Sequence, residues 1–167
     1  FLFHDRKTEF LINEKNVINL VLSPPARHPY LFKIWFNYII PKAFKKHSID
    51  LFFSPDGFIS LNTKIDQIGV IHDLNFEHYP EDLPKIVVNY YKKYMPLFAE
   101  KAKQIITVSN FSKKDIINKY DIHPEKLHVI YNGANENFKK LSETTKIQFV
   151  KSNNNSRPFF IYVGSLH

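Results

Sequence analysis

The pair His72-Asp73 combines side chains that can do chemistry with a position in the sequence where chemistry is expected. It follows residues 67–71, an apolar run typical of a buried strand. A histidine at the end of such a strand can donate to a ligand hydroxyl or phosphate, or act as an acid or base near neutral pH. The aspartate can orient that histidine or hold a substrate hydroxyl. A polar pair that only caps the end of the strand is the alternative.

Ser109 and the pair Asn132-Gly133 follow two further apolar runs, at residues 105–108 and 127–131. A short helix is expected between these runs. They therefore form a strand–helix–strand unit, whose strands are parallel and joined by a right-handed crossover. In sheets of this kind, ligands bind outside the carboxyl ends of the strands. Ser109, Asn132 and Gly133 are thus predicted to lie at the functional edge.

The helix in this unit has its own start signal. Ser112 and Asp115 have the spacing of a capping box, in which each side chain bonds a backbone N–H of the first turn. Ser109 precedes the same helix, where backbone N–H groups and the helix dipole attract anions. Simple capping explains Ser109 equally well, so both alternatives stay open for this serine.

A basic, proline-rich loop at residues 23–29 holds Arg27 and His28. Its three prolines restrict the backbone, and the arginine guanidinium can bind a phosphate or carboxylate through two parallel hydrogen bonds. A solvated loop is the alternative. Residues 54–57 (SPDG) also follow a predicted strand, but a tight turn explains their composition without any functional role.

Several kinds of site are not expected. The chain has no cysteine, which excludes disulfides, thiol catalysis and cysteine-bound metals. Glu77, His78, Glu81 and Asp82 are metal-binding residue types, but their spacing matches no closed site. With four glycines and no glycine-rich phosphate motif, a self-contained dinucleotide or triphosphate site is not expected either. The sequence therefore implies no metal and no cofactor.

Strands and helices alternate along the chain, which predicts an α/β fold with a Rossmann-like, mostly parallel sheet flanked by helices. Pro41 should kink or split the first long helix. The expected strands cover residues 17–22, 49–53, 67–71, 105–108 and 127–131, the helices cover 30–46, 85–103 and 139–151 besides the one after Ser109, and 75–84 is an irregular loop.

The domain boundaries follow from composition. We expect one domain at residues 1–151, a polar linker at 152–158, and from residue 159 the first strand of a second domain, which is truncated. The chain starts without methionine and stops as that strand ends. We therefore expect a fragment of a longer protein.

The formal net charge of +7 is unevenly distributed. Residues 1–48 carry eight Lys and Arg against three Asp and Glu, whereas residues 49–167 carry fifteen against thirteen. A basic surface can face phosphates, anionic lipid or nucleic acid, or be merely solvated. The most apolar segment, residues 30–40, is too short to span a membrane, and no signal peptide is visible.

Four blocks of the sequence are residues 70–74 (VIHDL), 102–113 (AKQIITVSNFSK), 127–134 (LHVIYNGA) with Phe138, and 160–166 (FIYVGSL). In this order and at this spacing, they resemble the family 4 glycosyltransferases, which are retaining enzymes of the "glycosyltransferase group 1" type with the GT-B fold. The resemblance implies two Rossmann-like domains facing across a cleft, with the acceptor bound mostly by the first and the nucleotide sugar mostly by the second. This chain resembles the acceptor-side domain without its first strand.

The resemblance also implies roles for single residues. His72 matches the family histidine that contacts the transferred sugar, and Asp73 matches its acidic neighbour, so these two are the predicted catalytic residues. Gly164 matches the donor-side glycine. Ala134-Asn135 stands where the family often has Val-Asp, which weakens any role for an acid at position 135.

Five further residues are predicted to bind substrate. Ser109 matches the serine that follows a strand in the family, and Asn132-Gly133 matches a block near the interdomain crevice. Arg27 and His28 in the basic loop correspond to the family more loosely.

We therefore expect a cytoplasmic enzyme that transfers a mannose- or glucose-type hexosyl group from a UDP- or GDP-linked sugar to a polysaccharide or lipid-linked acceptor. Nucleic acid is not an expected partner, and the fragment alone is expected to be inactive. The basic first third, Trp35 and a tyrosine-rich helix would suit peripheral contact with the inner face of an anionic membrane. The apolar strand from residue 159 would pair with a second molecule and give a dimer.

Two alternatives come from other classes. A non-catalytic basic module that binds nucleic acid or another anion would use the positive charge, but no recognition motif supports it. Another Rossmann-like enzyme, such as a sugar epimerase, would need the missing glycine fingerprint.

Overall fold

The structure is a computed structural model that describes residues 1–9, 11–154, 157 and 159–162. The chain divides into two compact units, Phe1–Asn132 and Gly133–His167. The second unit contains α6 (Glu143–Asn154), and residues 159–162 in it form neither helix nor strand. The strand expected over residues 159–163 is therefore not formed at its first four residues, and Val163 lies outside the described residues.

The first unit is built on two sheets in which every strand pair is parallel. In the larger sheet, the order β3-β4-β5-β6 is also the order of these strands along the chain. The carboxyl ends of its strands therefore lie at one edge. The small sheet pairs β1 (Leu2–His4) with β2 (Asn19–Val21), and the larger sheet holds β3 (Leu51–Ser54), β4 (Asp66–Val70), β5 (Gln104–Thr107) and β6 (Leu127–Val129).

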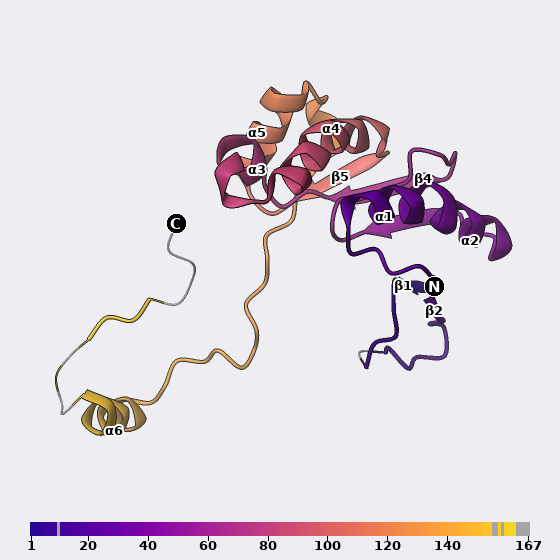
Figure 1. Cartoon of the computed structure of the whole chain (residues 1–167). Coiled ribbons are helices and arrows are strands. Elements are labelled where there is room, and N and C mark those ends of the chain that lie inside the picture. Colours follow the sequence, from indigo (N-terminus) through magenta and orange to yellow (C-terminus); the bar gives the residue numbers. More distant parts are fainter. Residues whose placement is uncertain (10, 155–156, 158, 163–167) are drawn as a thin grey trace. The chain divides into compact units, whose positions relative to one another are not determined.

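Helices connect these strands, which confirms the predicted α/β, Rossmann-like class. Figure 1 shows α1 and α2, between β2 and β3, as one continuous run of helix. The connection from β4 to β5 contains α3, η2 and α4, and the connection from β5 to β6 contains α5 and η3. Their bounds are α1 (Pro29–Ile34), the π segment η1 (Trp35–Ile39), α2 (Ile40–Lys46), α3 (Asn75–His78), the 3₁₀ turn η2 (Pro80–Asp82), α4 (Lys85–Lys101), α5 (Asn110–Tyr120) and the 3₁₀ turn η3 (Pro124–Lys126).

Pro41 changes the type of helix in the run from α1 to α2 without ending it. Directly before the proline, η1 widens into a π turn in which the Ile40 N–H donates to the Trp35 carbonyl. Proline has no N–H, so the carbonyl four residues earlier loses its helical partner. That carbonyl belongs to Asn37, and it accepts a hydrogen bond from the Asn62 side-chain amide at 3.2 Å. The split expected at Pro41 is therefore a short π segment. The Asn37 carbonyl, which has no helical partner, accepts from the Asn62 side chain instead.

Apolar side chains of the first unit form two clusters. The sheet cluster lies among the larger sheet, α4 and α5, and the helix cluster lies under the run from α1 to α2. Phe58, in the loop between β3 and β4, packs against both. The buried members are Ile59, Ile71, Leu74, Phe76, Met95, Phe98, Ala99, Ala102, Ile105, Ile116, Ile122 and Leu127 in the sheet cluster, and Trp35, Phe36, Ile40 and Phe44 in the helix cluster.

The predicted capping box is wrong. Helix α5 begins at Asn110, and its N-cap is Ser109, whose hydroxyl accepts from the Ser112 N–H at 3.0 Å. The backbone is already extended at Ser109, so the helix can start three residues earlier than the capping box implies. The Asp115 side chain bonds His78 on α3 instead of the helix start.

Two other local predictions need correction. Residues 75–84 are not an irregular loop, because α3 and η2 form within them. The predicted helix at 139–151 is shifted toward the carboxyl end, since the Ser142 hydroxyl accepts from the Thr145 N–H at 3.1 Å and so begins α6 later.

Among the described residues, no helix combines the length and the apolar composition that crossing a bilayer requires.

Candidate functional site

A cavity of about 280 Å³, which we call the small cavity, lies where β4 ends. His72 and Asp73 both line it, so the structure brings the two predicted catalytic residues together. The His72 Nε2 lies 3.2 Å from the Pro55 carbonyl. A carbonyl can only accept, so the His72 Nε2–H is the donor in this contact. The other lining residues are Asp56, Phe58, Val70, Ile71, Phe76, Tyr91 and Met95.

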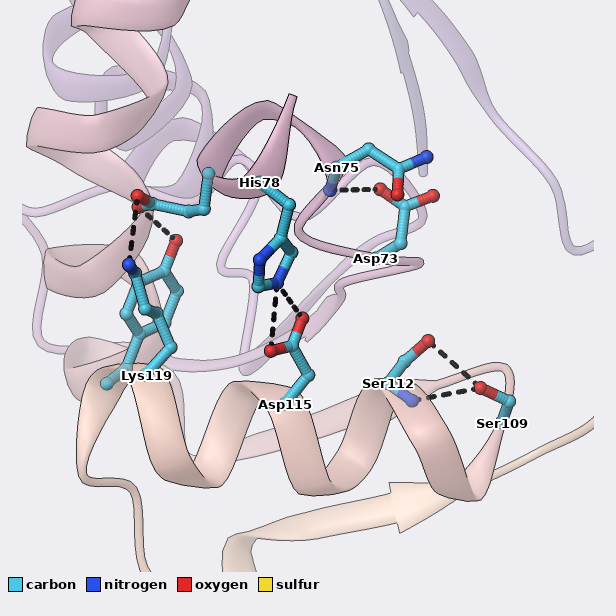
Figure 2. A network of polar contacts seen from close by, with 9 residues as sticks. Asp73, Asn75, His78, Ser109, Ser112, Asp115 and Lys119 are labelled. Atoms are coloured by element: carbon cyan, nitrogen blue, oxygen red, sulfur yellow. Dashed lines mark hydrogen bonds and ion pairs between the residues drawn. The ribbon is translucent and has the colours of Figure 1, made fainter. Parts of the chain in front are cut away.

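Asp73 is held by the backbone that follows it. Its Oδ1 accepts from the Asn75 N–H at 3.0 Å, and Figure 2 shows this bond at the start of α3. Short polar side chains often bond the backbone two residues on in this way. Asp73 therefore orders the turn into α3, and its catalytic role stays a prediction.

The loop that carries His72 and Asp73 is fastened to α5 through α3. Figure 2 shows His78 pointing at Asp115, and its Nε2 lies 2.8 and 3.0 Å from the two carboxylate oxygens. The Glu77 carboxylate accepts from the Tyr120 hydroxyl at 3.2 Å and lies 3.8 Å from the Lys119 ammonium. We call these contacts the α3–α5 clasp.

The clasp includes a buried charge. The Glu77 side chain is 8% exposed, so its carboxylate depends on protein partners in place of water. Burial raises the pKa of Tyr120, and the neighbouring Glu77 and Asp115 charges raise it further. The tyrosine therefore stays protonated and can keep donating to Glu77. The clasp thus fixes α3, and with it the rim of the small cavity.

Ser109 is an N-cap in this structure. Its hydroxyl accepts from the Ser112 N–H and lies 2.9 Å from the Ser112 hydroxyl, at the start of α5 in Figure 2. The capping alternative for Ser109 is confirmed, and its role in binding substrate stays a prediction.

A cavity of about 580 Å³, the large cavity, contains Arg27 in its lining. Arg27 Nε lies 3.2 Å from Asp5 Oδ2, which also accepts from the Ala26 N–H at 3.0 Å. These contacts fix the basic loop against the chain that follows β1. The lining combines charged groups with aromatic rings: Phe3, His4, Asp5, Arg6, Thr8, Ala26, Arg27, Phe32, Trp35, Phe36, Asp56 and Phe58.

His28 is placed differently from its neighbour Arg27. It is the N-cap of α1: its ring nitrogen accepts from the Tyr30 N–H at 3.4 Å, and its ring stacks on that of Tyr30 with centroids 5.3 Å apart. It does not line either cavity. Its predicted binding role has no support from this position and stays a prediction.

Asn132 and Gly133 are not among the residues that line the two cavities. Asn132 ends the first unit and Gly133 begins the second, and both are exposed. A Cβ added at Gly133 would meet no atom within 4 Å, so space does not demand glycine there. Gly164 lies outside the described residues. The binding roles of all three stay predictions.

Asp56 is the residue of this site that the sequence interpretation missed. The composition of residues 54–57 predicts a tight turn, and a turn does form there. Asp56 nevertheless lines both the small and the large cavity. It follows β3 at the same edge of the sheet where His72 follows β4, and that placement was the available signal. Asp5 and Phe58 gave no comparable signal, because distant contacts bring them to the large cavity.

The described residues contain no group of three or more His, Asp and Glu side chains that could hold a metal ion. What the small cavity offers is a histidine of fixed orientation, two carboxylates and apolar walls. Such a site can position a polar ligand and stabilise charge that develops on it.

A family model described as Glycosyltransferase Family 4 matches residues 2–138, which is well over half of the sequence. The chain belongs to glycosyltransferase family 4. Within the matched residues of this family 4 chain lie both cavities and all predicted site residues except Gly164.

Among solved structures, this family 4 chain is similar to a crystal structure of a glycosyltransferase from Rickettsia africae ESF-5, with 16% sequence identity and a TM-score of 0.45. The likeness covers 86% of this chain and 37% of that chain. The family 4 chain thus spans little more than a third of the length of that protein. No curated protein matches it.

Proposed function

We propose that the protein containing this chain transfers a mannose- or glucose-type hexosyl group from a UDP- or GDP-linked sugar to a polysaccharide or lipid-linked acceptor, with retention of configuration. The chain supplies the acceptor-side half of a GT-B fold and is inactive alone. The observation that carries this proposal is the His72-Asp73 cavity at the carboxyl edge of the sheet, in a chain of glycosyltransferase family 4.

The chemistry of such a transfer sets what the site must do. Charge develops on the departing diphosphate and on the oxocarbenium-like sugar, so positioning and electrostatics supply most of the rate enhancement. The bond to Pro55 orients the His72 ring, which then positions a hydroxyl of the transferred sugar. The amino terminus of α5, capped by Ser109, favours negative charge and can face the diphosphate without a metal.

The large cavity is the proposed acceptor site. Aromatic rings from the helix cluster offer flat apolar faces, and Arg27 and Asp5 offer charged groups at the same wall. Sites for small polar ligands typically combine apolar walls with a few fixed polar groups. The mixture fits a carbohydrate, which has many hydroxyls and apolar C–H faces.

The first test uses the full-length protein and a panel of UDP- and GDP-sugars, with hydrolysis and transfer measured for wild type, His72→Ala and His128→Ala. His128 is the control, because it is also exposed and bonds one partner, Gln104 at 2.6 Å, outside both cavities. We expect one donor to be turned over, and His72→Ala to lower that rate by about 100-fold or more, as for other oriented donors.

Each result has a definite meaning. Turnover unaffected by His72→Ala would keep the enzyme class and remove His72 from the mechanism. No turnover of any donor by the wild type would reject the proposed activity. Equal losses in His72→Ala and His128→Ala would indicate damage to the fold.

We also propose peripheral contact with the inner face of an anionic membrane, through residues other than Trp35 and the tyrosine-rich helix. Trp35 and Tyr90 are buried in the first unit. The outer face of α1 and η1 instead exposes Tyr30 (70%), Ile34 (42%) and Tyr38 (54%). They recur every four positions, so they form one stripe on the helical run.

Lysines accompany this stripe. Lys33, Lys42, Lys45 and Lys46 are exposed, and residues 29–46 contain no Asp or Glu. Anionic lipid attracts each such lysine by roughly 1 kcal/mol near the surface. An amphipathic helix with aromatic and aliphatic side chains beside lysines is typical of proteins that lie on a membrane.

Vesicle sedimentation tests this contact with vesicles of phosphatidylcholine, with and without phosphatidylglycerol. We expect binding only to the anionic vesicles, and loss of it when Lys42, Lys45 and Lys46 are changed to Glu. The matched control changes Lys92, Lys101 and Lys114, which are equally exposed, to Glu. Binding that ignores lipid charge, or falls equally in both variants, would contradict the proposal.

A dimer through the segment from residue 159 remains part of the proposal. Phe160, Ile161 and Tyr162 are strongly exposed apolar side chains in that segment. Sedimentation velocity of the chain with Phe160→Ser and Ile161→Ser tests it: a wild type that is already monomeric would reject the dimer.

A further inference from the structure

The two cavities share part of their lining, and the shared residues are Asp56 and Phe58. Phe58 joins them as an aromatic wall, with ring centroids 5.3 Å from Phe32 on the large-cavity side and 5.8 Å from Tyr91 on the small-cavity side. Asp56 is the charged group common to both linings. A ligand in one cavity therefore approaches a ligand in the other at the turn after β3.

This turn is anchored on both sides of Asp56. On one side, the Pro55 carbonyl accepts from the His72 ring at 3.2 Å. On the other side, Gly57 has φ +74°, and a Cβ there would lie 3.0 Å from the Val70 carbonyl oxygen and 3.3 Å from Met95 Cε. Only glycine lets the turn lie this close to the end of β4. Asp56 is thus held at a fixed place relative to His72.

The Asp56 carboxylate is available to a ligand. Asp56 is exposed, and it lines both cavities. Its charge also reaches the small cavity, because the pKa of Tyr91 is raised first by burial and then by Asp56. A carboxylate so placed can accept hydrogen bonds from hydroxyl groups.

We propose that Asp56 accepts a hydrogen bond from the acceptor hydroxyl that attacks the donor sugar. A carbohydrate acceptor that lies over the aromatic rings of the large cavity is thereby aimed at the sugar beside His72. This inference rests on the proposed function and adds a residue to it. As the acceptor oxygen bonds to the anomeric carbon, the bond from that carbon to the diphosphate breaks, and the departing diphosphate takes the hydroxyl proton. Asp56 takes no proton, so its contribution is the alignment of the two reacting groups.

Donor hydrolysis separates this role from a merely structural one. In hydrolysis the attacking group is water, which is small and needs no alignment by the large cavity. Loss of the Asp56 charge should therefore lower transfer to a carbohydrate by a larger factor than it lowers hydrolysis. A damaged turn would instead disturb the bond between Pro55 and His72 and lower both rates by the same factor.

The experiment compares wild type, Asp56→Asn, Asp50→Asn and His72→Ala in the full-length protein, with octyl glucoside and octyl mannoside as acceptor probes. Asp50 is the matched control, since it is exposed and directly precedes β3 at its other end. We expect Asp56→Asn to lower kcat/KM for the acceptor by about 10- to 100-fold, the loss typical of a hydrogen bond to a charged group. Hydrolysis of the donor falls by a clearly smaller factor in this variant, whereas His72→Ala lowers both rates to a similar extent.

The outcomes distinguish this inference from the proposed function. Equal transfer by wild type and Asp56→Asn, or a parallel fall of transfer and hydrolysis, overturns the role of Asp56 alone. A wild type that neither hydrolyses nor transfers overturns the proposed function and this inference with it. If the wild type only hydrolyses, calorimetric titration of octyl glucoside and octyl mannoside into wild type and Asp56→Asn decides. Weaker octyl glycoside binding by Asp56→Asn then supports the inference, and equal binding rejects it.

Discussion

The sheet cluster and the helix cluster of the first unit differ in how firmly they can hold a site. Of the described residues, twelve are buried in the sheet cluster, from β5, β6, α3, α4, α5 and the segments that connect them, but only four in the helix cluster. The small cavity rests on the first, and the large cavity is walled by the second together with the chain around β1 and the basic loop. We infer that the larger number of buried side chains in the sheet cluster holds His72 in place, whereas the walls of the proposed acceptor site can shift more.

The largest expected effect compares Phe98→Ala with Phe44→Ala. Both rings are almost fully buried, at 2% and 1% exposure. Truncation of a buried Phe costs about 3–5 kcal/mol of unfolding free energy, and less where neighbours can collapse into the space. We expect Phe98→Ala near the upper end and Phe44→Ala near the lower end in urea unfolding. Equal losses would remove the distinction between the clusters.

The next effect concerns the turn that connects the clusters. Gly57→Ala places a methyl group 3.0 Å from the Val70 carbonyl oxygen in a left-handed backbone conformation. We expect a loss of about 1–3 kcal/mol, the usual cost of such backbone strain. Thermal unfolding with Gly133→Ala as control measures it, because Gly133 has open space around it. An equal, small effect at both glycines would show that the turn adjusts freely.

Helix caps give a smaller test of the same contrast. Ser109 caps α5 beside the sheet cluster with a hydroxyl at 3.0 Å, and His28 caps α1 beside the large cavity with a ring nitrogen at 3.4 Å. Ser109→Ala should cost about 1 kcal/mol, as is typical of an N-cap serine. His28→Ala should cost less, because its bond is longer. Denaturant midpoints decide, and a larger loss at His28 would reverse the order.

The smallest effect appears only in alkali. Burial raises the pKa of Tyr90, where the two clusters approach each other, and burial together with Glu77 raises that of Tyr120. The folded state therefore keeps these two hydroxyls protonated at a pH at which the same tyrosines lose their protons in the unfolded chain. Stability should be complete below pH of about 10 and fall as the pH rises above it.

Tyr90→Phe and Tyr120→Phe should each flatten this decline in unfolding measured against pH, because a phenylalanine cannot ionise. A decline that Tyr120→Phe flattens and Tyr90→Phe leaves unchanged would show that water reaches Tyr90 between the clusters. Tyr38→Phe is the control, since Tyr38 is exposed.

Local patterns were enough to predict the α/β class, the larger sheet and the placement of His72 and Asp73 at the edge of that sheet. Strand periodicity carries this information, because a parallel strand is apolar along most of its length and ends in polar residues. The capping of α5 was misplaced by three residues, since Ser109 and Ser112 both have cap chemistry and only the extended backbone at Ser109 decides between them. Pro41 indicates an irregular helix. The Asn62 amide that bonds the Asn37 carbonyl comes from a distant loop and could not be predicted locally.

Distant contacts explain what the sequence alone did not predict. His78 and Asp115 are 37 positions apart, and nothing near either residue indicates that they bond. Asp5 reaches Arg27 across 22 positions to form one wall of the large cavity. Asp56 was locally a turn residue, and its position between two cavities depends on where α1, β1 and α4 pack.

The order of the larger sheet bears on how the protein is made. Each strand pairs with the one that precedes it in the chain, so β4 meets a finished β3, and β5 and β6 follow in turn. During synthesis, which adds about 5–20 residues per second, the sheet can grow from one side as the ribosome releases the chain. Every strand of this sheet after β3 finds a partner that has already been translated, which shortens the time in which the sheet edge is open to other nascent chains.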